Sequence, residues 1–285
     1  MTCTWTPSRQ YSDYVETQMR GDGGTLQYMY HPARNGAKII GDTIYIRTLQ
    51  PEEFTLRAPD CTTFLVGEAC NTQVALTKYN YVHKFCLDDC DWPEVVNDVG
   101  MMGVARAEAT AFHTAILPLI YADMIANGTA VASGAADPSA AQMLAAINTC
   151  VLSINANGGS PGAIVLDLTN AGDFVAGAGA MFQPSNMLSL PLYGDGGPAG
   201  WFLGYPVFVT KTNLATAAAT PVSVAALVWS IQGFAYASSG DAGGYLGMKV
   251  VPHPDDENGT NSIVAKLCAG YKTLEADLVY YVTQA

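Results

Sequence analysis

The chain has 285 residues, of which 49% are hydrophobic and only 13% are charged, and its formal net charge is −12. A typical soluble domain is about 25% charged. A lone subunit of this composition has few charges to cover its surface, so extensive contact with other protein chains is favoured. No lysine and arginine cluster supplies the basic face that specific binding of duplex nucleic acid requires. The excess of acidic residues would repel DNA that is packed close to the protein. Alternatively, it serves only to keep the protein soluble.

Residues 1–40 show no lasting periodicity of apolar residues. They mix aromatic side chains with a glycine-rich stretch at residues 21–24, so they cannot bury much apolar surface against themselves. We expect this segment to lie as an extended arm over another surface.

A long β-hairpin is predicted over residues 41–85. Ile44 and Ile46 alternate with polar neighbours, and a second alternating run covers residues 73–85. The stretch between the two runs would form the tip, and it carries Glu52, Glu53, Arg57 and Asp60. A lone hairpin is marginal in water, so this one needs a partner surface.

The clearest pattern in the chain predicts a long helix over residues 91–127. Asp91 is typical of an N-cap and Pro93 of a first turn, whereas Asn127 and Gly128 are typical of a helix end. Between them apolar residues recur at gaps of three and four, which gives about eight turns with one apolar stripe. The stripe comprises Val95, Val99, Met102, Ala105, Ala109, Phe112, Ile116, Leu119 and Ile120. Pro118 is expected to kink this helix near its end.

A compact α/β module is predicted next. It starts with an alanine-rich helix over residues 136–157, begun by Asp137 and Pro138. The apolar stripe of this helix is Met143, Leu144, Ile147, Val151 and Ile154. A buried strand over residues 163–168, a partly helical segment over 170–181 and strands over 204–210 and 226–237 follow.

The chain then returns to β-structure. Strands are predicted over residues 245–252 and 262–267, with a turn at residues 255–259 between them. A last strand covers residues 278–282. These strands must return to the long helix, because they have no core of their own.

The sequence carries no familiar catalytic motif: nucleophile elbow, zinc-protease helix and phosphate-binding loop are all missing. His113 lies beside the apolar stripe and is expected in a core or interface rather than in catalysis. Asp88, Asp89 and Asp91 could bind a hard cation, but a solvated helix start is the preferred interpretation. We expect no metal and no cofactor.

Seven scattered cysteines do not form a disulfide-scaffold pattern. Cys86 and Cys90 are the one close pair, and they lack partners at zinc spacing. Cys61 and Cys70 could pair across the hairpin, although free thiols are the default. The start of the chain shows no secretion signal, and the apolar run at residues 115–126 is broken by a proline and an aspartate, so no membrane association is expected.

The order of these elements resembles the major capsid proteins of tailed phages, which share the Hong Kong 97 shell fold. Residues 41–46 (GDTIYI) resemble the start of the family's extended loop. Residues 203–207 (LGYPV), followed by 210–213 (TKTN), resemble a segment late in the axial domain. Residues 269–272 (AGYK), followed by 278–282, resemble the final peripheral strand pair.

The resemblance implies an α+β fold in four parts. These are an N-terminal arm (1–40), an extended loop formed by the hairpin (41–85), a peripheral domain with the spine helix (86–135 and 238–285) and an axial domain (136–237). Some relatives carry a scaffolding segment ahead of the shell domain, and from this sequence we expect none.

The resemblance also implies a structural, non-enzymatic function. The chain would self-assemble into the pentamers and hexamers of an icosahedral shell that encloses phage DNA without sequence preference, in a virion assembled in the host cytoplasm. Its partners would be further copies of itself, with scaffolding, portal and cement or decoration proteins, and no membrane. An encapsulin-type compartment, which holds protein cargo, is the alternative of the same fold. An α/β hydrolase-like enzyme and a jelly-roll capsid or decoration protein are more distant alternatives.

An arm and a loop without cores of their own would be buried on neighbouring copies. The hypothesised inter-subunit contacts are ion pairs of Arg47, Glu52, Glu53, Arg57 and Lys78, and apolar docking of Trp5 and Phe54. Exposed ion pairs contribute about 0–1 kcal/mol each, so the aromatic side chains and strand pairing should dominate.

Overall fold

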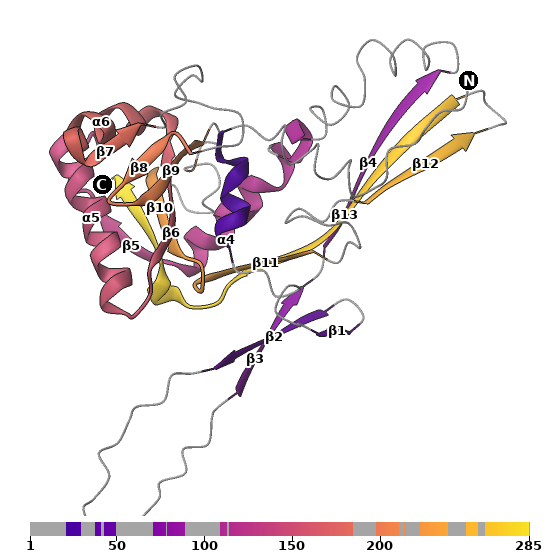
Figure 1. Ribbon diagram of the computed structural model, residues 1–285, viewed down its shortest axis with the longest axis horizontal. Helices are drawn as coiled ribbons and strands as arrows, with labels where there is room; N and C mark the ends of the chain where they lie inside the picture. The colour runs from indigo at the N-terminus through magenta and orange to yellow at the C-terminus, as the bar shows by residue number, and fades with distance from the viewer. Residues whose placement is uncertain are drawn as a thin grey trace, which may run out of the picture.

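The computed structural model describes residues 21–29, 38–40, 43–49, 71–77, 79–88, 109–112, 114–184, 198–210, 214, 223–238, 249–255 and 260–284. In these residues the strands form three sheets (Figure 1). The helical segments are η1 (Gly21–Tyr28), α4 (Leu117–Asn127), α5 (Ala140–Ala156), α6 (Leu168–Ala178), η4 (Gly179–Met181) and η5 (Ala276–Leu278).

A seven-stranded sheet forms the centre of the molecule. Its strands, in spatial order, are β5 (Thr129–Ala132), β14 (Val279–Gln284), β10 (Ser223–Ser230), β6 (Pro161–Asp167), β9 (Tyr205–Thr210), β8 (Gly200–Phe202) and β7 (Phe182–Pro184). The β14–β5 and β6–β9 pairs are parallel, and the other pairs are antiparallel.

Both faces of this sheet are covered, which explains why its inner strands are continuously apolar. In β6, Val165 faces a cluster with α4 and η1, whereas Ile164 and Leu166 face a cluster with α5 and α6. In β10, Leu227 likewise faces the cluster with α4 and η1, and Val228 faces the cluster with α5 and α6. The described core therefore has two layers, one on each side of the sheet.

Helix α5 confirms the predicted alanine-rich helix but begins later than expected. Ser139 is its N-cap, and its side chain and that of Gln142 form a reciprocal capping box. Because the side chain of Ser139, rather than that of Asp137, caps the free N–H groups of the first turn, the helix starts at Ala140. Four of the five residues in the predicted stripe are buried, namely Met143, Ile147, Val151 and Ile154.

Only the last part of the predicted long helix lies in the described residues. Helical residues run from Ala109 to Asn127 and are interrupted at Ile116, two residues before Pro118, which has no N–H to donate. The helix ends at Gly128, as predicted. Leu119, which was assigned to the apolar stripe, is 45% exposed, so that assignment was wrong.

The helix at Ala109–Asn127 has the length and composition of a membrane span, a property that buried core helices share. Phe112, Tyr121 and Met124 from it are buried between the seven-stranded sheet and the base of the four-stranded sheet. Its position in the described structure is that of a core helix.

The predicted hairpin is confirmed, but the second run of alternating residues divides between two sheets. β2 (Thr43–Leu49) pairs antiparallel with β3 (Asn71–Thr77) in a three-stranded sheet completed by β1 (Lys38–Ile40). After β3 the chain changes partner, and β4 (Tyr79–Asp88) pairs with β13 (Thr260–Thr273). The hairpin ladder therefore ends at Thr77 instead of continuing to residue 85.

The four-stranded sheet is built around β13. β4 pairs along one edge of it, and β12 (Lys249–Asp255) and β11 (Phe234–Ser238) follow one another along the opposite edge. The predicted strand over residues 226–237 is in fact two strands, β10 and β11, which belong to different sheets. Residues 269–273 and 279–284 do not form the expected final pair, because β14 joins the seven-stranded sheet.

Part of the predicted arm belongs to the chain's own core. Residues 21–28 form the short 3-10 segment η1, and Leu26 and Met29 beside it are buried against the seven-stranded sheet. The indole N–H of Trp229 donates a hydrogen bond to the carbonyl of Tyr28 at 3.2 Å. Sequence periodicity missed this contact because a segment of eight residues is too short to show a lasting apolar period.

Candidate functional site

Two groups of strands project from the seven-stranded sheet and its helices. β13 has 14 residues, or about 45 Å of extended chain, and with β4 and β12 it runs away from the cores, while β2 and β3 extend in another direction (Figure 1). A two-stranded ladder is marginal alone, and a larger one needs an apolar face or a helix to pack against. Such projections are typical of proteins whose strands find a partner surface on another chain.

The base of the projecting strands is fixed to the core by α4. The carboxylate of Asp123 accepts hydrogen bonds from the backbone N–H of Thr273 at 2.8 Å and from the Thr273 hydroxyl at 3.1 Å. Its other oxygen accepts from the side-chain amide of Asn127 at 3.1 Å. One aspartate therefore connects the end of β13 to the end of α4.

A tyrosine cluster lies beside this junction. The rings of Tyr79 and Tyr271 stack with centroids 5.6 Å apart, and the rings of Tyr79 and Tyr81 are 6.4 Å apart. Burial, followed by the hydrogen bond with Tyr81, raises the pKa of Tyr271 well above its usual range, so its hydroxyl stays protonated. Next to the cluster, Val82 is 64% exposed.

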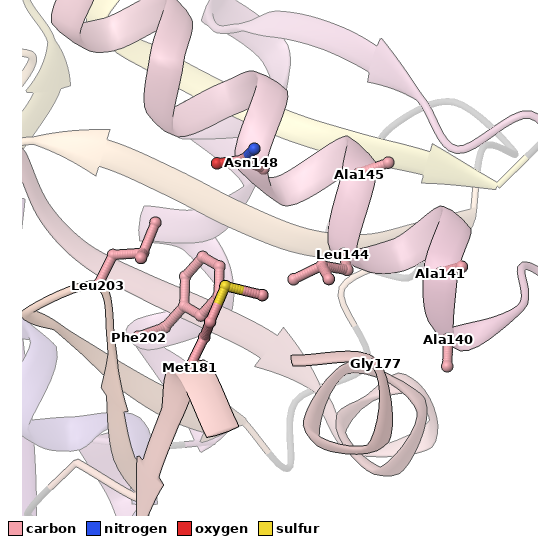
Figure 2. A pocket seen from close by; sticks show the side chains of 9 residues that line it. All are labelled: Ala140, Ala141, Leu144, Ala145, Asn148, Gly177, Met181, Phe202 and Leu203. Atoms are coloured by element: carbon pink, nitrogen blue, oxygen red, sulfur yellow. The ribbon is translucent and has the colours of Figure 1, made fainter. Parts of the chain in front are cut away.

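An apolar groove of about 440 Å³ lies between α5, α6 and the β8–β9 turn (Figure 2). We call it the α5–α6 groove. It is lined by Ala140, Ala141, Leu144, Ala145, Asn148, Gly177, Met181, Phe202 and Leu203. Asn148 is the one polar side chain among these nine residues, so the lining offers contact surface but no acid or base.

The floor of the groove is closely packed. The ring of Phe202 meets Phe174 edge-on at 5.2 Å, and Phe174 meets Phe182 edge-on at 6.3 Å. At one end α6 approaches α5 so closely that a Cβ on Gly177 would lie 2.3 Å from the carbonyl oxygen of Ala140. Glycine is required there for the two helices to meet.

Cys150 is the cysteine whose side chain the structure describes, and it is buried. Burial raises the pKa of the Cys150 thiol to about 12, which keeps it protonated and unreactive. No cluster of three or more histidine, cysteine, aspartate or glutamate side chains within the described ranges could hold a metal ion. The predicted aspartate cluster and His113 fall wholly or partly outside those ranges.

The sequence-predicted contact residues lie mostly outside the described part of the chain. Arg47 is placed by its backbone, in β2 opposite Gln73 of β3. The others, which are Trp5, Glu52, Glu53, Phe54, Arg57 and Lys78, fall outside it, as do Cys61 and Cys70. Their roles remain predictions.

Sequence reasoning missed the α5–α6 groove. Leu144 was assigned to a buried stripe, and Met181 and Leu203 carried no signal of exposure, although they are 47% and 51% exposed. The signal that could have revealed it is the Leu203-Gly204 dipeptide, because Asn-Gly is the usual choice where a two-residue turn joins two strands.

No protein-family model matches the sequence, and neither does any curated protein. The fold, in contrast, matches solved structures over most of the chain. The capsid structure of cyanophage P-SCSP1u is 13% identical, with a TM-score of 0.60, over 90% of this chain and 86% of that one. The mature capsid of bacteriophage PhiM1 is 13% identical, with a TM-score of 0.53, over 86% of this chain and 82% of that one.

The capsid of the native GTA particle gives a similar result, with 13% identity and a TM-score of 0.53 over 92% of this chain and 90% of that one. At such low identity the agreement concerns the path of the backbone. The matches cover 86–92% of the chain. The chain therefore has the α+β, Hong Kong 97-type fold of the tailed-phage major capsid proteins, as its order of elements predicted.

Proposed function

We propose that this chain is the major capsid protein of a tailed bacteriophage, a structural subunit without catalytic activity. The observation that carries the proposal is the match to phage capsid structures over 86–90% of the chain. A chain built to act alone has no use for long ladders outside its cores, whereas a shell subunit needs them to reach its neighbours. The low charge of the chain agrees with a surface that is largely covered by other copies.

Assembly would produce pentamers and hexamers that close into an icosahedral shell around phage DNA. In the two ring sizes the same subunit makes slightly different contacts. Projecting hairpins, which can change their shape, suit this better than rigid flat faces do. The excess of 25 acidic over 13 basic residues disfavours tight adhesion of DNA to the inner wall. Scaffolding, portal and cement proteins would be further partners, and the particle would form in the host cytoplasm.

The proposed division of the chain keeps the arm (1–40), extended loop (41–85), peripheral domain (86–135 and 238–285) and axial domain (136–237), with two changes. Residues 21–29 pack in the chain's own core, and β14 pairs with β10 of the axial sheet. In the rest of the arm and the loop, Trp5, Phe54 and the charged residues of the loop would contact neighbouring copies.

The encapsulin-type alternative shares the fold and differs in its contents. Particles purified after nuclease treatment should contain protected DNA when the chain is expressed with its packaging genes, and portal and terminase genes should lie beside its own. Particles that hold a specific cargo protein and no DNA would favour the compartment. Electron microscopy with light scattering on the expressed protein tests both forms of the proposal, since each requires rings or closed shells.

A further inference from the structure

We propose that the α5–α6 groove receives residues 187–193 from a second copy of the chain, so that neighbouring subunits in a ring join head to tail. This inference rests on the proposed shell function and deepens it by naming one contact. Its three parts are an unfavourable leucine at the rim of the groove, an apolar segment of matching chemistry, and the point at which the chain leaves the β7–β8 hairpin for that segment.

The first part is the conformation of Leu203. It has a φ of 52°, the one positive value among the non-glycine residues that the structure describes, and Gly204 follows with 86°. Two positive φ values between β8 and β9 define the hairpin turn that Asn-Gly forms with least strain. A leucine there costs about 1–2 kcal/mol of backbone strain, and its side chain stands 51% exposed beside Met181 and Phe202 (Figure 2). A strained, exposed apolar residue gains nothing for this fold, which points to a contact with another chain.

The second part is the sequence between β7 and β8. Residues 187–193 read MLSLPLY, with six apolar or aromatic residues and one serine, and they carry no charge. The nine residues that line the groove carry none either. Docking one on the other would bury apolar surface on both sides without leaving a charge unpaired.

The third part is position. β7 and β8 pair from Phe182 opposite Phe202 to Pro184 opposite Gly200. The groove lies at the Phe202 end of this short hairpin, and the chain leaves for residues 187–193 at the Pro184 end. The groove thus lies at one end of the hairpin, and the chain continues toward the apolar segment from the other end. A contact between two different parts of the subunit is the kind that a head-to-tail ring uses.

The first test exploits the strain at Leu203. Leu203→Asn should raise the melting temperature of the unassembled subunit, because asparagine tolerates the turn better, and should lower the assembly rate about tenfold, because the apolar contact is lost. Leu152→Asn is the matched control, since Leu152 is 59% exposed on α5 and does not line the groove. It should change neither quantity appreciably. Normal assembly of the Leu203→Asn variant would overturn the inference.

The second test finds the partner directly. A photo-crosslinking amino acid replaces Leu190, and light and ¹⁵N-labelled subunits are mixed, assembled and irradiated before peptide mass spectrometry. The inference predicts mixed light–heavy pairs that join residue 190 to peptides containing residues 140–148, 181 or 202–203. Pairs within one isotope only, crosslinks elsewhere on the shell, or crosslinks to another protein would each overturn it. Placing the same amino acid at Tyr193 repeats the test if the first substitution prevents assembly. If wild-type subunits form no particles even with the products of neighbouring genes, the proposed function fails and this contact fails with it.

Discussion

Replacing Asp123 by alanine should loosen the projecting strands from the core. The aspartate accepts the N–H and hydroxyl of Thr273 on one oxygen and the amide of Asn127 on the other. Thr273 is only 8% exposed, so its N–H loses its acceptor and cannot easily find water instead. Leaving a buried donor unsatisfied costs about 1–3 kcal/mol, and hydrogen bonds to a charged group lie at the upper end of that range.

The expected loss is about 2–4 kcal/mol, because the buried N–H and the hydroxyl both lose a charged acceptor. For a chain of this size about 1 kcal/mol corresponds to 2–4 °C, so the melting temperature should fall by roughly 5–15 °C. Differential scanning calorimetry of the unassembled subunit measures it. Asp173→Ala is the control, since Asp173 is exposed on α6 and its loss changes the charge equally. The melting temperature of Asp123→Asn should lie between those of Asp123→Ala and Asp173→Ala. The amide keeps one oxygen that can accept a hydrogen bond, but it places an NH₂ group where the second carboxylate oxygen accepted one.

If the Asp123→Ala variant has the same melting temperature as the Asp173→Ala control, the aspartate does not hold β13 to α4, and the reasoning is refuted. The same conclusion follows if hydrogen exchange at the Thr273 amide is unchanged, because that amide is the donor that the substitution exposes.

Three further predictions concern other parts of the chain. Ser139→Ala removes the capping box of α5 and should cost about 1 kcal/mol in a denaturant titration; an unchanged midpoint would contradict the role of the cap. At pH 8 a thiol with a pKa of about 12 is thiolate in about one molecule in ten thousand. Iodoacetamide should therefore leave Cys150 unmodified in the folded subunit and label it in urea. Rapid labelling of the native protein would show that the thiol is accessible. Phe54→Ala should reduce particle yield on a sucrose gradient more than Glu53→Ala, because an apolar anchor contributes more than an exposed ion pair; equal losses would argue against aromatic docking of the loop.

The elements that the sequence predicted well are those in which local and tertiary preferences agree. The stripe of α5 reflects burial of one helix face, which a period of 3.6 records directly, and the alternation of period 2 over residues 43–49 and 71–77 marked two strands that do pair. The apolar run of β6 was also recognisable, because a strand covered on both faces has no polar positions.

The changes of partner were not predictable from the sequence. Lys78 and residues 231–233 separate strands that belong to different sheets, yet the β-pattern continues across each of these points. Periodicity reports which face of a strand is buried and says nothing about which strand lies beside it. The partner is set by tertiary packing around α4, where Asp123 binds Thr273 at the base of β13.

The α5–α6 groove was hidden for a related reason. Leu144 belongs to a stripe that is otherwise buried, and only the tertiary position of Met181 and Leu203 leaves this part of α5 open. From the sequence alone, an apolar residue that faces its own core cannot be distinguished from one that faces a neighbouring chain. The unusual Leu203-Gly204 turn is the trace that this surface leaves in the sequence.

The central claim is that this chain builds a closed shell with copies of itself, and cryo-electron microscopy of the protein co-expressed with the products of its neighbouring genes tests it most directly. The account predicts closed particles with five- and sixfold rings, in which the β2–β3 hairpin of each copy lies on an adjacent copy. A stable monomer that forms neither rings nor shells with any of those products would contradict it.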